Sequence, residues 1–286
     1  MILTRRAALL GSAALLSGCA GSPLVDAPDG VMRVVAEDPV QDPAFATAAA
    51  LVAAVRAAVE GQPAGGWRDG ALAQCDEQLA RFSSADPFSD PEPIFPVSEP
   101  TDTEFPNAIS QAVDGLIELA NAAESGGHAL LLVSTAAATH GLLNQQSIPG
   151  EGSPPSHVEP LAGQRQNALT HVWALISALE QGLAHLGSKD PLKEQAQQRL
   201  HDLKTLRALL REDAADPAPS QPPYFELPAM TTPAEIATGW AQLEVGLAEA
   251  LVLLAAEEQT NHDLWRRQIE MAQEVGGQIP RWPGWD

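Results

Sequence analysis

The chain has 286 residues and is strongly acidic, with 37 Asp and Glu against 16 Lys and Arg and a formal net charge of −21. Such a surface is repelled by the phosphates of nucleic acids and of anionic lipids, which excludes nucleic acid as an expected partner. Only two cysteines are present, Cys19 and Cys75. If Cys19 is used for another purpose, no disulfide within the chain remains, and burial of apolar side chains must stabilise the fold.

Residues 1–18 have the layout of a secretory signal peptide. Arg5 and Arg6 give a positive start, a largely apolar run extends from Ala7 to Leu16, and small residues precede Cys19. The apolar run is too short to span a bilayer, so we expect a segment that is removed rather than a membrane helix.

The sequence Leu16-Ser17-Gly18-Cys19 resembles the lipobox of bacterial lipoproteins. This resemblance implies cleavage before Cys19 and attachment of acyl chains, such as palmitate, through its sulfur. The protein would then be held by lipid on the extracytoplasmic face of the cell membrane, as part of the cell envelope. The alternative is an ordinary secretory signal with an incidental cysteine.

The pair Arg5-Arg6 also resembles the twin-arginine export signal, which carries folded proteins. Ala8 stands where that signal usually has Phe. A positive start for the general secretory route explains the same two arginines, so both export routes stay open.

Ala- and Leu-rich periodic segments, with few aromatic residues and no convincing strand, predict an all-α protein. We expect a flexible tether over residues 19–41, an N-terminal helical region over 42–146, a linker over 147–158 and a helical bundle over 159–286. The predicted helices cover residues 43–60, 67–81, 106–124, 127–146, 159–186, 191–212, 233–258 and 261–275.

Local start signals place several of these helices. Asp42-Pro43 and Asp190-Pro191 each combine a capping aspartate with proline at the first helical position. Thr232 and Glu235 have the spacing of a capping box. The apolar positions of the helices that begin near residues 159 and 233 repeat every three or four residues, as in a bundle. Two hairpins joined by one long crossover are typical of ferritin-like four-helix bundles.

Motifs along residues 159–284 resemble the ferritin-like domain of unknown function found in actinobacterial exported proteins and lipoproteins. The resemblance is carried by Ala178-Leu179-Glu180, His201, Tyr224-Phe225-Glu226-Leu227-Pro228, Gln242-Leu243-Glu244, Arg266-Arg267 and Trp282-Pro283-Gly284. It implies a ferritin-like four-helix bundle and a location in the cell envelope. The helices predicted over residues 42–146 add an N-terminal helical layer to this bundle. The family has no established activity.

A di-iron centre in such a bundle needs one Glu from each of two helices and a Glu-x-x-His pair from each of the other two. Glu180 and Glu244 could be remnants of the single glutamates. Near His201 the clamp reads Gln198-Arg199-Leu200-His201, with a neutral amide where a carboxylate is required. We therefore predict no metal, no cofactor and no catalytic residue, and we interpret Glu180 and Glu244 as polar residues satisfied within or at the rim of the core.

The sequence favours a membrane-anchored, non-catalytic binding or structural module whose protein or small-molecule partner is unknown. The alternative is a metal-dependent oxidoreductase, with two iron or manganese ions, or an iron-storage relative. A carrier of a small hydrophobic ligand between helices is a third possibility. Cys75 is expected to be a small buried side chain, and Trp282 and Trp285 either plug the end of the bundle or form an exposed docking element.

Overall fold

The computed structural model describes residues 39–89, 92–100, 103–157, 161–212, 220–222 and 224–285. Within these ranges the chain forms eight α-helices, and the only β pairing is two isolated bridges, Ser84 with Pro93 and Gly150 with Pro280. The prediction of an all-α protein is confirmed. The predicted leader, Cys19 and nearly all of the predicted tether lie outside the described residues, and the chain from Val40 onward forms one compact unit.

The first four helices are α2 (Pro43–Glu60), α3 (Gly66–Phe82), α4 (Phe105–Asn121) and α5 (Gly126–Gly141). α2 begins as expected, because the Asp42 carboxylate accepts a hydrogen bond from the Ala44 N–H at 2.8 Å. The Ser125 hydroxyl accepts one from the His128 N–H at 3.1 Å and caps α5 in the same way.

α5 is shorter than the sequence predicts. It ends at Gly141 rather than at Gln146. The Asn144 side-chain oxygen accepts a hydrogen bond from the Gln146 N–H at 3.1 Å, which gives the backbone a turn in place of another helical turn.

The other four helices are α6 (Gln164–His185), α7 (Pro191–Glu212), α8 (Pro233–Glu258) and α9 (His262–Glu274). The capping box of Thr232 and Glu235 is present at the start of α8. The start of α6 is capped from a different helix, because the Glu257 carboxylate of α8 accepts hydrogen bonds from the N–H groups of Gly163 and Gln164 at 2.9 and 2.8 Å. A carboxylate at this end of a helix also complements the helix dipole.

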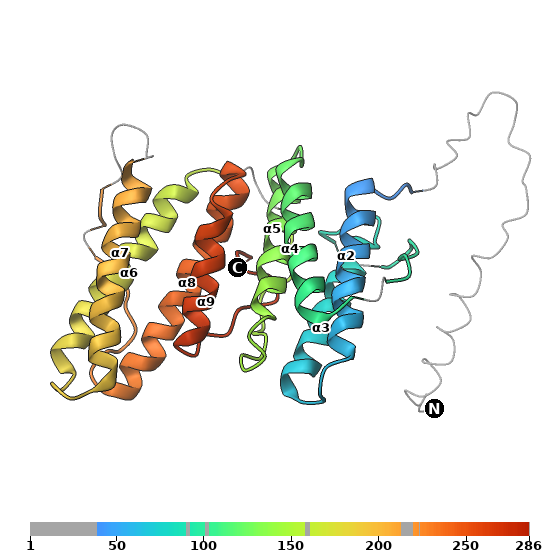
Figure 1. Cartoon of the computed structure of the whole chain (residues 1–286). Helices are drawn as coiled ribbons and strands as arrows, with labels where there is room; N and C mark the ends of the chain where they lie inside the picture. The colour runs from blue at the N-terminus through green and yellow to red at the C-terminus, as the bar shows by residue number, and fades with distance from the viewer. Residues whose placement is uncertain are drawn as a thin grey trace, which may run out of the picture. The chain divides into compact units, whose positions relative to one another are not determined.

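The helices of this unit pack side by side in a sequence of neighbouring pairs (Figure 1). α2 lies against α3 and α4, and α4 packs on α5. α6 lies against α7 and α8, and α8 packs on α9. α5 contacts both α8 and α9 and so joins the first four helices to the last four. Within the described residues α7 and α9 are not closely packed against each other, and this separation creates the groove considered below.

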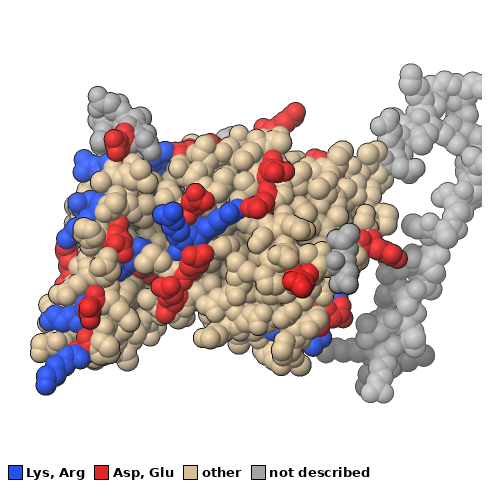
Figure 2. Space-filling model, viewed as in Figure 1, with Lys and Arg blue, Asp and Glu red and all other residues tan. Residues whose placement is uncertain are grey.

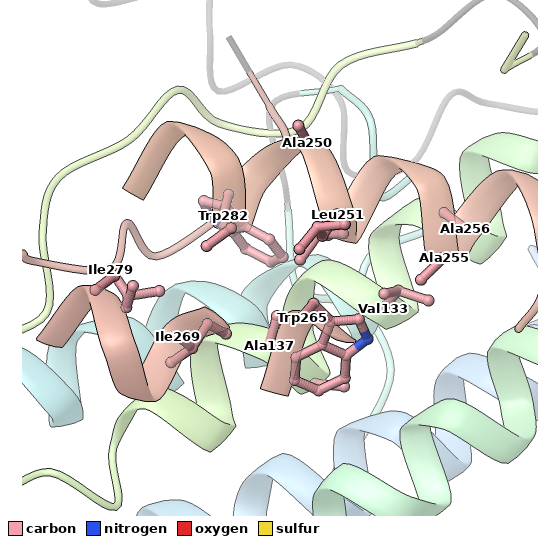
Figure 3. Close-up of a cluster of buried hydrophobic side chains, with 14 of the residues drawn as sticks. Val133, Ala137, Ala250, Leu251, Ala255, Ala256, Trp265, Ile269, Ile279 and Trp282 are labelled. Atoms are coloured by element: carbon pink, nitrogen blue, oxygen red, sulfur yellow. The ribbon is translucent and has the colours of Figure 1, made fainter. Parts of the chain in front are cut away.

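Small side chains form the junction at which α5, α8 and α9 meet (Figure 3). Val133 of α5 lies next to Ala255 and Ala256 of α8, and Ala137 of α5 lies next to Trp265 of α9, all of them buried. The fully buried Trp265 of α9 fills much of the remaining space. One continuous hydrophobic core therefore runs through all eight described helices.

The closing segment, residues 279–285, folds back into this core. Trp282 is completely buried, and its indole N–H donates to the Glu77 carboxylate of α3 at 2.6 Å. Trp285 is also buried, and the Ile279 carbonyl accepts from the Gly150 N–H at 2.7 Å. Both tryptophans are therefore buried and plug a space in the core, rather than forming an exposed docking element.

Two described helices, α2 and α8, are long and apolar enough to cross a membrane by length and composition alone. Core helices of soluble proteins pass the same test. In this fold the apolar side chains of both helices contribute to the shared core, with Val52 and Leu251 among the buried residues.

Candidate functional site

The three residues that the sequence singles out as remnants of a metal site do not come together. Glu244 of α8 is buried, with 1% of its surface exposed. The Glu180 side chain on α6 is 57% exposed and lies 3.8 Å from the Lys204 ammonium. His201 of α7 is exposed as well. Among the described residues, no group of three or more His, Cys, Asp or Glu side chains has the geometry to hold a metal ion.

Glu244 is the centre of a buried polar network, which consists of Arg199, Trp240, Glu244 and Gln268. Arg199 approaches from α7 and forms a two-point ion pair, with Nε 2.8 Å from Glu244 Oε1 and Nη2 2.7 Å from Oε2. Trp240, one turn before Glu244 on α8, donates its indole N–H to Oε1 at 2.7 Å. Two parallel charge-assisted hydrogen bonds give the Arg199–Glu244 pair both strength and a fixed geometry.

Gln268 brings α9 into the network. Its Nε2 donates to the Glu244 main-chain carbonyl at 3.0 Å and to Oε2 at 2.5 Å, while its Oε1 accepts from Arg199 Nη2 at 2.6 Å. The network therefore joins α7, α8 and α9 through groups that are almost entirely removed from water: Arg199 is 5% exposed and Gln268 is 3% exposed. Satisfied networks of this kind fix one arrangement of the surrounding helices.

Arg199 and Gln268 were missed at the sequence level. The residues considered on α7 were Gln198 and His201, but the inward face of α7 carries Ala196, Arg199 and Leu203. A signal for this face is present in the sequence, because positions 196, 199, 200 and 203 repeat every three or four residues. On α9 the same spacing places Gln268 on the face of Trp265, Ile269 and Ala272.

A groove runs along the network between α7 and α9. It consists of two hollows, of about 860 and 390 Å³, which share Arg199, Asp202 and Met271 in their linings. The larger hollow, the acidic section, also contains Glu194 and Glu274 and has Trp240 and Glu244 in its floor. The smaller hollow, the basic section, is lined by the shared three residues and by His201, Thr205, Leu206, Leu209, Leu264, Arg267 and Gln268.

One edge of the Arg199 guanidinium takes no part in the network and borders the groove. Nε and Nη2 make all the hydrogen bonds of this side chain, and Nη1 has no partner among the described residues. Nη1 is not sealed from solvent either, and Arg199 lines both sections of the groove. The network therefore holds a cationic N–H group in place beside a space large enough for a small molecule.

Other features of the described chain lie apart from this network. A hollow of about 970 Å³ lies between the outer face of α8, residues 226–228 and residues 276–278, and it touches no member of the network. Cys75 is fully buried on α3, as expected, and burial raises the pKa of its thiol to about 12. A thiol in this state is protonated and unreactive at neutral pH.

Comparisons of the chain with protein-family models, with curated protein sequences and with solved structures found no match.

Proposed function

We propose that this chain is a lipid-anchored, extracytoplasmic binding module, that its helices α6–α9 form a ferritin-like bundle, and that it holds a ligand in the α7/α9 groove without catalysing a reaction. The bundle assignment is supported by the connections. The α6/α7 and α8/α9 hairpins have short corners, and one long crossover joins Glu212 to Pro233.

The observation that carries the non-catalytic part is the way Glu244 is used. Both of its carboxylate oxygens accept hydrogen bonds from Arg199, Trp240 and Gln268, so a guanidinium already neutralises its charge. A two-metal centre needs several carboxylates that face a common point and offset the metal charge. With Glu180 and His201 at exposed positions, the residues present do not fit such a centre.

Elemental analysis tests this part directly. Protein purified without chelators from the cells that produce it should contain far less than one iron or manganese ion per folded chain. A stoichiometric amount of either metal that survives dialysis would overturn the non-catalytic proposal and favour the oxidoreductase or iron-storage alternative. A Glu244→Gln variant of the same preparation shows whether any bound metal uses this carboxylate.

The proposed extracytoplasmic location is supported by the charged and apolar pattern of residues 1–18 and by the lipobox-like Leu16-Ser17-Gly18-Cys19. The acidic composition supports an anchor made of lipid, because the protein surface itself has little attraction for anionic membranes.

Mass spectrometry of protein extracted from membranes should show Cys19 as the acylated N-terminus, and a Cys19→Ser variant should lose the lipid and leave the membrane fraction. An unmodified Cys19 thiol, or a chain that keeps residues 1–18 and stays in the cytosol, would refute this address.

A further inference from the structure

We infer that the basic section of the α7/α9 groove binds the carboxylate of a single-chain amphiphile of the fatty-acid class. The carboxylate pairs with Arg199 and Arg267, and the acyl chain lies along Leu206, Leu209 and Leu264. This inference rests on the proposed function, since it assigns a ligand class to the groove proposed there.

The head-group position follows from the two guanidinium groups. Arg199 is held by Glu244 and Gln268 with its Nη1 edge unpaired, and it lines the basic section. Arg267 of α9 lines the same section, is exposed, and forms no ion pair with any described residue. A guanidinium presents parallel N–H groups that match the two oxygens of a carboxylate.

The basic section also has an apolar wall on which an acyl chain can lie. Leu206, Leu209, Leu264 and Met271 line it from both helices. Leu209 is 44% exposed and therefore open to a ligand in the section. The volume of about 390 Å³ lies within the range of small-molecule pockets, roughly 300–1,000 Å³. A medium-length acyl chain fits this space.

Basic side chains are concentrated in the C-terminal helices, where the basic section lies. Residues 40–157 contain only three basic residues, Arg56, Arg68 and Arg81, whereas α7 alone carries five. On the face in Figure 2, most Lys and Arg side chains lie over the C-terminal helices. Asp202 also lines the basic section, and its carboxylate accepts a hydrogen bond from Gln198 Nε2 at 3.1 Å. Glu244 already balances the charge of Arg199, so Arg199 contributes the N–H groups of Nη1 to the head-group position and Arg267 contributes the second guanidinium.

The acidic section fixes the direction of the ligand. Glu194 and Glu274 lie at that end of the groove and repel a carboxylate, so the head group stays beside Arg199 and Arg267. The overall negative charge also disfavours docking on an anionic bilayer, and the inferred ligand is therefore a monomeric amphiphile rather than a membrane surface.

Calorimetric titration of the full chain carrying Cys19→Ser with decanoate, below its micelle concentration, tests the inference. One-to-one, saturable binding is expected. Arg267→Gln and Leu209→Gln should each weaken it by about tenfold, the size expected for a lost charge-assisted bond or a lost apolar contact. Arg207→Gln is the matched control, because Arg207 lies on α7 but does not line either section of the groove. The affinity of this variant for decanoate should differ from that of the unchanged sequence by less than about twofold. Circular dichroism establishes that each variant is folded.

Two neutral or cationic probes separate failure of this inference from failure of the proposed function. If decanol or decyltrimethylammonium binds as tightly as decanoate and Leu209→Gln weakens it, the groove is a binding site but the carboxylate assignment is wrong. If none of the three probes binds, the fatty-acid inference is wrong, and the metal and acylation measurements decide the proposed function on their own. Sedimentation with phosphatidylglycerol vesicles that depends on Arg267 would overturn the choice of a monomeric ligand.

Discussion

Removing one partner of the Arg199–Glu244 pair should destabilise the protein far more than removing both. Both groups are almost fully buried, so Arg199→Met leaves Glu244 as an uncompensated charge, and Glu244→Leu does the same to Arg199. A buried charge left without its partner costs about 3–5 kcal/mol in the free energy of unfolding. Each single variant should lose this amount.

The double variant Arg199→Met/Glu244→Leu should cost much less than the sum of the two. It has no unpaired charge, and Gln268 keeps its 3.0 Å hydrogen bond to the main-chain carbonyl of residue 244. The remaining cost comes from the lost partners of the Trp240 indole N–H and of Gln268 Oε1, about 1–3 kcal/mol for each group. The coupling between the two substitutions should therefore reach several kcal/mol.

Urea unfolding followed by circular dichroism and tryptophan fluorescence measures all three variants. The pair Arg266–Asp114 provides a matched control cycle, because its atoms are also 2.7 Å apart but its side chains are 29% and 65% exposed. Its coupling should stay below about 1 kcal/mol. Additive effects at Arg199 and Glu244, or a coupling no larger than that of the control, would refute the description of this network as buried and mutually dependent.

Three further outcomes are expected. Trp282→Ala removes a fully buried indole and leaves the Glu77 carboxylate without its 2.6 Å donor, so the free energy of unfolding measured in urea should fall by about 3–5 kcal/mol. A fall of less than about 1 kcal/mol would contradict the buried position of Trp282 in the core. Burial lowers the pKa of both His140 and His262 below 6.5, so these side chains take up protons at a higher pH in the unfolded chain than in the folded protein, and the free energy of unfolding should fall as the pH drops below about 6.5. A variant with both histidines changed to Gln should lose much of this pH dependence, and an unchanged pH dependence would contradict the assignment to these two histidines. Cys75, whose thiol pKa burial raises to about 12, should resist alkylation by iodoacetamide at pH 8 until urea unfolds the chain, and rapid labelling of the native protein would be inconsistent with its position.

The helices that could be predicted from the sequence are those with local start signals. Asp42-Pro43 and the Thr232–Glu235 capping box depend only on residues within one turn of each other, and both appear as expected. α5 ends at Gly141, before its predicted end at Gln146, because the competing turn at Asn144 depends on one side-chain hydrogen bond.

Only part of the candidate site could be predicted, because its residues come from helices that are far apart in the sequence. The sequence predicts that Glu244, like Glu180, lies within or at the rim of the core, but the partner of Glu244, Arg199, is 45 positions away in the chain. The spacing of Ala196, Leu200 and Leu203 places Arg199 on the inward face of α7, but it does not show which acidic residue pairs with the guanidinium. Neighbouring residues on a helix point about 100° apart, so the way α7 packs on α6 decides which of residues 198–201 are buried.

The closing segment also bears on how this protein is made. Trp282 completes the surroundings of Glu77, a residue that the ribosome adds 205 positions earlier. Until that indole has been synthesised, the Glu77 carboxylate of α3 lacks its 2.6 Å donor, and the space that Trp282 fills in the finished core stays empty. The finished architecture is therefore reached only late in biosynthesis, and an interrupted translation product that stops before Ile279 should be a preferred target for chaperones and proteases.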